Sequence, residues 1–130
     1  MLPVYNKSMV LTGNAIKKLI SDGKLKLEPE PEVKETSIKI HFAESLTVKP
    51  KEFVIATSKE TFEIPANIAG LYDGYTHLAR RGIITHLGSM FVDPGTKGNI
   101  TFEVFNASDK EVVIEAGDRA GHLILLQVKD

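Results

Sequence analysis

Apolar and polar residues alternate with the period of a β-strand over most of the chain after Ser37. The first run, residues 37–42, is apolar at every second position, which is typical of a half-buried strand. Further short apolar runs are separated by turn sequences rich in Pro, Gly, Asn and Asp, and they lie at 46–48, 52–56, 60–64, 70–72, 83–86, 98–105, 112–114 and 122–126. Many short strands at this spacing predict a mainly β sandwich or barrel.

One earlier segment has helical spacing instead. Its apolar residues fall on one face of a helix at Ile16, Leu19 and Ile20. Thr12 precedes them as a capping residue, and Gly23 follows where a helix would stop. The pattern predicts one short N-terminal helix at about 13–22. The strand pattern is broken once more at 78–82, where we expect a short helical turn.

Length and composition fit one domain. The chain has 130 residues, of which 42% are hydrophobic and 25% are charged, and both fractions are ordinary for a globular protein. We expect a single domain over 1–130. Within it, residues 1–8 are expected to form a loosely held lead-in, and the acidic, proline-rich residues 28–36 are expected to form a connector.

Charge and cysteine content argue against several classes of protein. Sixteen Lys and Arg against 17 Asp and Glu give a net charge of −1, whereas a nucleic-acid-binding domain usually has a basic surplus. The absence of cysteine excludes disulfides and thiolate zinc sites. No apolar run approaches the roughly 20 residues of a membrane helix, and the N-terminus lacks a signal-peptide pattern. We expect a cytoplasmic protein with no membrane or nucleic-acid partner.

Few residues stand out for chemistry on pattern alone. The histidines are dispersed without a metal-ligand spacing, so no metal site is predicted. Residues 73–82 gather hydroxyl, imidazole and guanidinium groups around a glycine. This set either binds phosphate or forms an exposed turn with incidental charges. Glu103 lies in the strand predicted at 98–105, and alternation alone would let it face water.

Taken together, ordered segments of the chain resemble the dCTP deaminase and dUTP pyrophosphatase (dUTPase) superfamily, especially its dCTP deaminase branch. Residues 74–82, Gly-Tyr-Thr-His-Leu-Ala-Arg-Arg-Gly, occupy the place of the family's Gly-Arg-Ser-Ser-Leu-Ala-Arg-Leu-Gly motif. The other matching segments are 9–12, 16–20, 49–58, 92–95, 98–106 and 116–123. The resemblance implies a distorted β-barrel or jelly roll, the dUTPase-like β-clip. It also implies a homotrimer with active sites between subunits, where a deoxyribonucleotide binds with Mg²⁺ and without zinc.

The resemblance also assigns roles to individual residues. Glu103 matches the glutamate that activates water for attack on C4 of cytosine, a position that is usually apolar in pure dUTP pyrophosphatases. Arg80 matches the arginine that orients this water, and Thr76 keeps the hydroxyl of a family serine. Segment 87–93 corresponds to the base pocket. The implied nucleotide-binding residues are His77, His86, Ser89, Asp93 and Arg119.

Several positions depart from the family pattern. Lys39 stands where the first motif has Asp, and Tyr75 stands where the second has Arg. His77 replaces a Ser, Gly88-Ser89 replaces Thr-Ala, and His122 replaces a Gln. Family members also continue beyond the point at which this chain ends, with a tail that closes over the nucleotide. The loss of such a lid and of phosphate contacts is expected to weaken triphosphate binding.

Three hypotheses follow. The first is a compact hydrolytic deaminase that converts dCTP to dUTP with Glu103 as the general base. The second is a dUTP pyrophosphatase, or a bifunctional enzyme that makes dUMP from dCTP and uses Asp93 for the phosphate step. The third is a non-catalytic, nucleotide-binding relative that keeps the scaffold.

Overall fold

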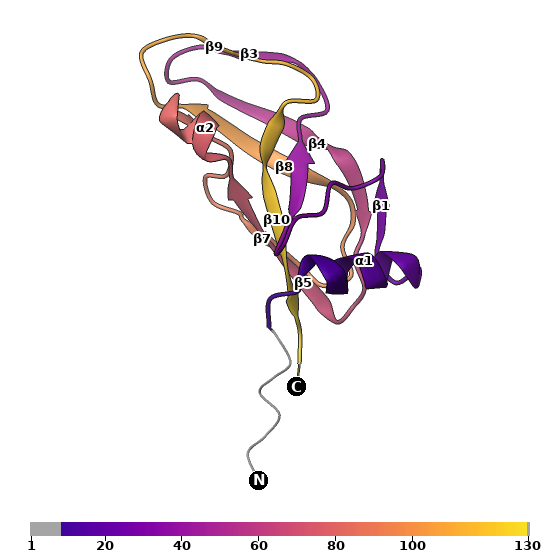
Figure 1. Ribbon diagram of the computed structural model, residues 1–130. Helices are drawn as coiled ribbons and strands as arrows, with labels where there is room; N and C mark the ends of the chain where they lie inside the picture. The colour runs from indigo at the N-terminus through magenta and orange to yellow at the C-terminus, as the bar shows by residue number, and fades with distance from the viewer. Residues whose placement is uncertain (1–8, 130) are drawn as a thin grey trace.

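The structure is a computed structural model that describes residues 9–129, so the lead-in predicted at 1–8 lies outside it (Figure 1). Its helices are α1 (Gly13–Ser21) and α2 (Thr76–Arg80). Its strands are β1 (Lys26–Glu28), β2 (Ile38–His41), β3 (Leu46–Val48), β4 (Phe53–Glu63), β5 (Ile68–Gly74), β6 (Ile83–Ile84), β7 (Phe91–Val92), β8 (Lys97–Asn106), β9 (Val112–Ile114) and β10 (Arg119–Gln127).

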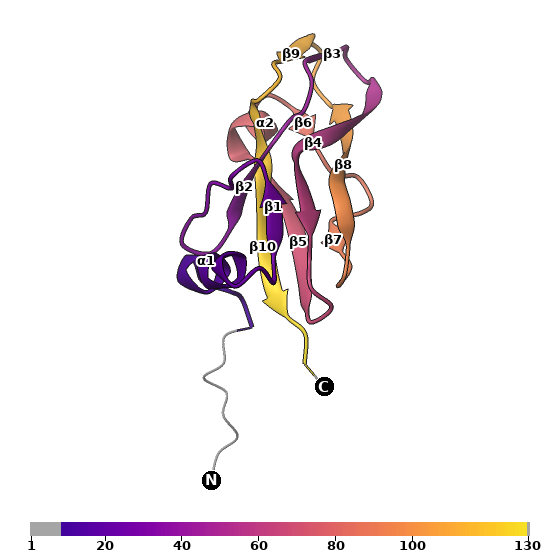
Figure 2. The same ribbon diagram turned by 90° about the vertical axis from the view of Figure 1, so that its right-hand side faces the viewer.

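The strands form two four-stranded antiparallel sheets and a two-stranded ribbon. One sheet has the order β1-β4-β8-β6, the other has the order β2-β10-β5-β7, and β3 pairs with β9. The two larger sheets face each other (Figure 2). Aromatic contacts join them, because the ring of Phe102 on β8 lies 5.0 Å from that of Phe42 and 5.2 Å from that of Tyr72 on β5. The mainly β prediction is confirmed, although the described strands do not close into one barrel.

Alternation along β8 turns Glu103 away from the core. Ile100, Phe102 and Val104 are buried between the sheets. Successive strand side chains point to opposite faces, so Glu103 emerges on the other face of the sheet with its register partner Ile55 on β4. The long β4–β8 pairing therefore supplies a rigid support for this carboxylate.

The predicted N-terminal helix is confirmed as α1. Thr12 caps it by accepting a hydrogen bond from the Ala15 amide at 3.3 Å, and Gly23 adopts φ 70° just after its end, as a helix stop requires. The chain before α1 pairs with β10, because the amide of Leu11 donates to the carbonyl of Leu125 at 2.9 Å.

Two strand predictions need correction. Segments 52–56 and 60–64, predicted as separate strands, are parts of the single strand β4, whose register shifts between Thr57 and Thr61. The hydroxyl of Ser58 bridges the irregularity, because it donates to the Glu60 carbonyl at 2.7 Å and accepts from the Ile100 amide at 2.9 Å. Strands β1 and β7 were not predicted. Both are short segments that are strands because they pair with β4 and β5, respectively.

The helical turn expected at 78–82 is α2, which begins two residues earlier at Thr76. The fold therefore has a second short helix in addition to the one at the N-terminus. Within residues 9–129, no helix has the length and apolar character needed to cross a membrane.

Candidate active site

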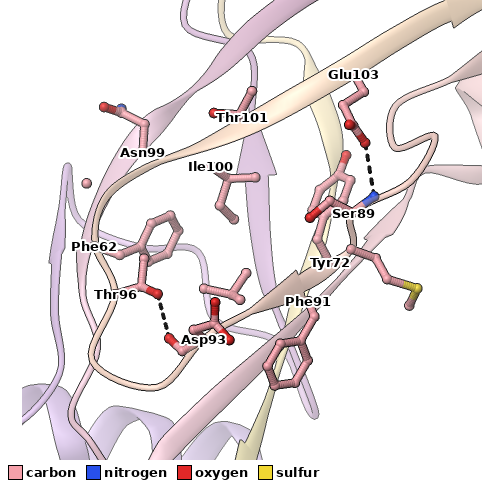
Figure 3. A pocket seen from close by; sticks show the side chains of 13 residues that line it. Phe62, Tyr72, Ser89, Phe91, Asp93, Thr96, Asn99, Ile100, Thr101 and Glu103 are labelled. Atoms are coloured by element: carbon pink, nitrogen blue, oxygen red, sulfur yellow. Dashed lines mark hydrogen bonds between the residues drawn. The ribbon is translucent and has the colours of Figure 1, made fainter.

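A cavity of about 270 Å³ opens between β8, β5 and the segment that contains β7 (Figure 3). It is lined by Phe62, Tyr72, Ser89, Met90, Phe91, Val92, Asp93, Thr96, Gly98, Asn99, Ile100, Thr101 and Glu103. Three of the predicted site residues, Ser89, Asp93 and Glu103, thus share one cavity. The predicted base-pocket segment 87–93 supplies much of its wall.

Glu103 does not extend freely into water. Its Oε1 accepts three backbone hydrogen bonds, from the amides of Leu87, Gly88 and Ser89, at 3.0, 3.0 and 3.1 Å. Figure 3 shows the bond from Ser89. The amide of Glu103 donates to the carbonyl of Thr85 at 3.0 Å, which ties β8 to the same segment. Within the described chain, Oε2 accepts no hydrogen bond and is the oxygen available for chemistry.

These contacts favour the ionised carboxylate. The amide of Gly88 contributes most to lowering the pKa of Glu103, followed by the amides of Leu87 and Ser89. The nearby His86 adds a smaller electrostatic effect that also lowers this pKa. Hydrogen bonds to the charged form are expected to act in this direction. Glu103 is therefore held as an oriented anion near neutral pH.

Asp93 introduces a second carboxyl group on the same cavity. It precedes a turn in which its carbonyl accepts from the Thr96 hydroxyl at 2.5 Å and from the Thr96 amide at 3.2 Å. The turn fixes the backbone of Asp93 while its side chain stays exposed. The cavity thus combines apolar walls with two carboxyl groups, a composition typical of a small-molecule site.

The α2 residues lie outside this cavity. Thr76, His77 and Arg80 are all exposed, and their side chains make no hydrogen bond to any other described residue. Arg80 lines a separate surface hollow with Ser108 and Lys110. Neither Thr76 nor Arg80 lines the Glu103 cavity of the described chain, and the catalytic roles of these three residues remain predictions.

His86 connects the cavity to a second polar cluster. Its ring packs edge-on against Tyr72, which lines the cavity, with the ring centroids 5.7 Å apart. Its Nε2 lies 3.9 Å from Oδ1 of Asp73. The other oxygen, Oδ2, lies 3.5 Å from Nε2 of His122, the register partner of Asp73 on β10. His86 and His122 therefore flank one carboxylate.

Arg119 lies at the far end of this cluster. Its Nη2 is 3.1 Å from Nδ1 of His122. Its Cζ lies 4.3 Å from the centroid of the Tyr75 ring, in cation–π contact. The Tyr75 ring in turn lies 5.9 Å from that of His77. The predicted nucleotide-binding residues therefore fall into two groups, Ser89 and Asp93 on the cavity and His77 and Arg119 around Tyr75, with His86 beside Tyr72 and Asp73.

Sequence reasoning missed several cavity residues. Asn99 and Thr101 share the outer face of β8 with Glu103, and the period of two along a strand would have identified both. Tyr72 was missed because it is buried, and its hydroxyl lies 2.9 Å from that of Thr85. Burial raises the pKa of Tyr72, so this phenol stays protonated.

Lys39, which replaces the expected first-motif Asp, points toward an acidic neighbour. Its Nζ lies 3.0 Å from Oε2 of Glu32. This ion pair is the largest cause of the lowered pKa of Glu32. Lys39 is not among the residues that line the Glu103 cavity.

A sequence model of the dCTP deaminase-like family matches residues 32–128, which include the whole cavity. The chain belongs to the dCTP deaminase-like family. Its sequence is 35% identical over 91 residues to a dUMP-forming dCTP deaminase of Corynebacterium glutamicum, covering 70% of this chain and 48% of that protein. It is 32% identical over 104 residues to the enzyme of the same name from Corynebacterium kroppenstedtii, covering 78% and 56%. This dCTP deaminase-like chain thus spans about half the length of the curated relatives it matches.

Solved structures agree on the fold of this dCTP deaminase-like chain. The G164S mutant of the Staphylococcus bacteriophage 80alpha dUTPase, with dUpNHpp, superposes with a TM-score of 0.69 at 17% identity, covering 82% of this chain and 83% of that one. This likeness confirms the predicted dUTPase-like β-clip fold. A mutant of the S. aureus phage phi11 dUTPase, whose structure details the coordination of a structural Mg(II) ion, gives a TM-score of 0.70 at 15% identity, covering 82% and 92%. At these identities the likeness shows the fold alone.

Proposed function

We propose that this chain carries the deaminating centre of a hydrolytic dCTP deaminase, with Glu103 as the general base. The observation that carries the proposal is the anchoring of Glu103 on the cavity wall, with Oε1 held by three backbone amides and Oε2 without a hydrogen-bond partner among residues 9–129. A preorganised carboxylate on an apolar-walled cavity suits proton transfer at a bound base.

The reaction consumes one water molecule and relocates both of its protons. Oε2 of Glu103 accepts a proton as the water oxygen forms a bond to C4 of cytosine. This proton then passes to the exocyclic nitrogen, the C4–N bond breaks, and ammonia leaves. The second proton of the water moves from the new C4 hydroxyl to N3 of the ring, which gives the C4 carbonyl of uracil. The balance is dCTP plus water to dUTP plus ammonia. The lowered pKa of Glu103 keeps the base ionised and favours return of the proton to the leaving group.

We propose that a neighbouring subunit completes this centre. Thr76 and Arg80 are exposed and do not line the cavity of their own chain, as expected if they serve the Glu103 of another chain. An apolar patch on the β4-β8-β6 sheet supports a homotrimer, because Phe53 and Ile55 are 50% and 57% exposed. Side chains of this kind commonly mark an interface.

The nucleotide is proposed to bind through the two groups of residues described above. Ser89 and Asp93 line the base cavity, and His77, His86 and Arg119 serve the sugar and phosphates. The described residues include no cluster of three or more carboxylate and histidine ligands suited to a metal ion. Mg²⁺ usually binds through one or two carboxylates and substrate phosphates, so Asp93 is the residue suited to share an ion that arrives with the nucleotide. When bound, this ion would neutralise phosphate charge.

A second candidate is release of dUMP from the same cavity. It is favoured by the relatives named dUMP-forming dCTP deaminases and by Asp93, which lies on the cavity with Glu103. In this scheme Asp93 activates water for attack on a phosphate after deamination.

Chromatography of products from dCTP and from dUTP, each with Mg²⁺, separates the candidates. dUTP from dCTP supports deamination alone. dUMP and pyrophosphate from dCTP support the bifunctional enzyme, and dUMP from dUTP alone supports a pyrophosphatase. The absence of any product from folded protein would support the non-catalytic relative and overturn the proposal.

A further inference from the structure

Tyr75, which departs from the family's phosphate-binding motif, packs against the guanidinium group of Arg119 from another part of the fold. Tyr75 stands where the motif has an arginine, which would remove a guanidinium group from the site. The structure places Arg119 over the Tyr75 ring, with Cζ 4.3 Å from the ring centroid. The amide of Tyr75 also donates to the carbonyl of Ala120 at 3.1 Å. The start of α2 and the start of β10 are therefore fastened together at this point.

The guanidinium of Arg119 retains unused hydrogen-bonding capacity. Among the described residues its side chain contacts a hydrogen-bonding partner only at His122. Its Nε is buried without a partner, and an unsatisfied buried donor is costly unless a ligand or water completes it. The adjacent Asp118 does not pair with it, because Oδ2 of Asp118 accepts from the Glu115 amide at 2.9 Å.

The surroundings of Arg119 suit an anion. A hollow of about 170 Å³ is lined by Tyr75, His77, Leu78, Arg81, Asp118 and Arg119. Two of these side chains are guanidinium groups, which bind phosphate oxygens through paired N–H donors. The carboxylate of Asp73 lies behind His122, 3.5 Å from its Nε2, rather than on the hollow.

We infer that Tyr75 and Arg119 together replace the missing motif arginine, with Arg119 contacting the nucleotide phosphates and Tyr75 acting as a positioning residue beneath it. The inference rests on the proposed function for the identity of the nucleotide. On this inference, the substitution at Tyr75 does not simply remove a phosphate contact. Arg119 makes that contact instead, and Tyr75 holds Arg119 in place. The ligand class is the phosphate chain of a deoxycytidine nucleotide.

Calorimetric binding in a Glu103→Gln background tests this without turnover. Arg119→Gln is expected to weaken dCTP binding about 10- to 100-fold, the range for a lost charged hydrogen bond. Deoxycytidine, which lacks phosphate, should bind equally to both proteins. Tyr75→Leu should weaken dCTP binding about 2- to 30-fold through loss of the cation–π support, whereas Tyr75→Phe keeps the ring and should retain the affinity.

A double variant separates positioning from an independent contact. If Tyr75 acts only through Arg119, Tyr75→Leu adds nothing to Arg119→Gln, whereas full additivity of the two losses would overturn the positioning role. Equal losses for dCTP and deoxycytidine would overturn phosphate recognition. Lys18→Gln, an exposed change of charge on α1, serves as the control and should leave binding unaltered.

The outcomes also separate this inference from the proposed function. If a protein with intact Glu103 binds dCTP through Arg119 but releases no ammonia, the deaminase proposal fails and the phosphate assignment stands. If it deaminates dCTP and Arg119→Gln leaves both KM and affinity unchanged, the phosphate assignment fails and the deaminase proposal stands. If dCTP does not bind at all, both fail. Inorganic pyrophosphate, titrated separately, shows whether the hollow binds phosphate without the nucleoside.

Discussion

The cavity around Glu103 and the exposed face of α2 contain residues of one predicted catalytic group, yet their environments differ sharply. Glu103 is held by three backbone amides and lines an apolar-walled cavity. Thr76 and Arg80 are exposed, with no side-chain hydrogen bond to another described residue. The first region is organised within one chain, whereas the second presents polar groups outward.

In the proposed function, one small chain provides both halves of a site without joining them. The paired strands β4 and β8 support the proposed base Glu103, and a helix of five residues, α2, carries the proposed orienting group Arg80. If the two halves meet across a subunit contact, assembly and activity are coupled.

The largest effect is expected at the base. Glu103→Gln should lower the rate of deamination about 10²- to 10⁴-fold, because a positioned general base contributes that much. The fold should persist, since the neighbouring Phe102 and Val104 still fill the core. Steady-state release of ammonia from dCTP measures the effect. Glu111→Gln, an exposed change of the same kind, is the matched control, and equal rates for wild type and Glu103→Gln would remove Glu103 from the mechanism.

Mixing two inactive variants tests whether Glu103 and Arg80 of different subunits form one site. Glu103→Gln and Arg80→Gln should each be nearly inactive alone. Unfolding the two variants and reassembling them together in equal amounts should restore about a quarter of wild-type activity. In a cyclic oligomer, two variants give four possible pairings of neighbouring subunits at each site, and one of the four joins an intact Glu103 to an intact Arg80. Recovery of no activity from a correctly assembled mixture would place both residues of a working site in one chain.

Substitutions of the two carboxyl groups of the cavity should lower the formation of different products. Asp93→Asn is expected to lower formation of dUMP from dUTP about 100-fold or more, if Asp93 is the base for the phosphate step. Deamination should change much less, because the anchoring of Glu103 does not involve Asp93. Chromatography of both reactions gives the ratio. Undiminished release of dUMP by the variant would discard this role.

Glu60 is a carboxylate whose expected role is to stabilise the fold. Glu60 is 3% exposed and lies outside the cavity. It accepts from the amide of His41 at 2.9 Å, and its other oxygen lies 2.6 Å from Nδ1 of His41. Glu60→Gln should lower the free energy of unfolding by about 1–3 kcal/mol, the cost of disturbing buried charged hydrogen bonds. Urea denaturation measures it, with Glu111→Gln as the control. An unchanged stability would contradict the structural role.

The smallest effect concerns pH. The pKa of Glu103 is lowered from its ordinary value of 4.5 by the backbone amides around Oε1. The active carboxylate form therefore predominates above that pH, and kcat/KM should decline only as the pH falls below 4.5. Gly88→Pro removes one N–H donor and should move this acid limb to higher pH.

Gly88→Ala supplies the matched control for the pH profile. It keeps the N–H, and an added Cβ meets no atom within 4 Å, so the profile should match that of the wild type. A profile that shifts equally in both variants would mean that the amide of Gly88 does not set the pKa.

The sequence predicted the elements that follow a clear period and missed those that depend on tertiary contact. The helical spacing around Ile16 and the alternation along 98–105 gave α1 and β8 nearly to their observed ends. β7 has only two residues and exists because β5 pairs with it. The register shift in β4 depends on the Ser58 hydroxyl, which no periodic pattern reveals.

The candidate site shows the same division. The family motif identified Glu103, Ser89 and Asp93, and the structure places all three on one cavity. The three amides converge on Glu103 because of the local backbone geometry, and a pattern of side chains does not predict that geometry. The contact between Tyr75 and Arg119 joins two motifs that are distant in sequence, so substitution at Tyr75 alone indicated only a loss.

The most direct test of the account follows the fate of dCTP given to purified wild-type protein and to the Glu103→Gln variant with Mg²⁺. Chromatography quantifies dUTP, dUMP and pyrophosphate, and a coupled assay quantifies ammonia. The account predicts one ammonia for each uracil nucleotide formed by the wild type and almost none from the variant. Equal ammonia release by both proteins, or no turnover by a folded and assembled wild type, would contradict the central claim that Glu103 is the base of a deaminating centre.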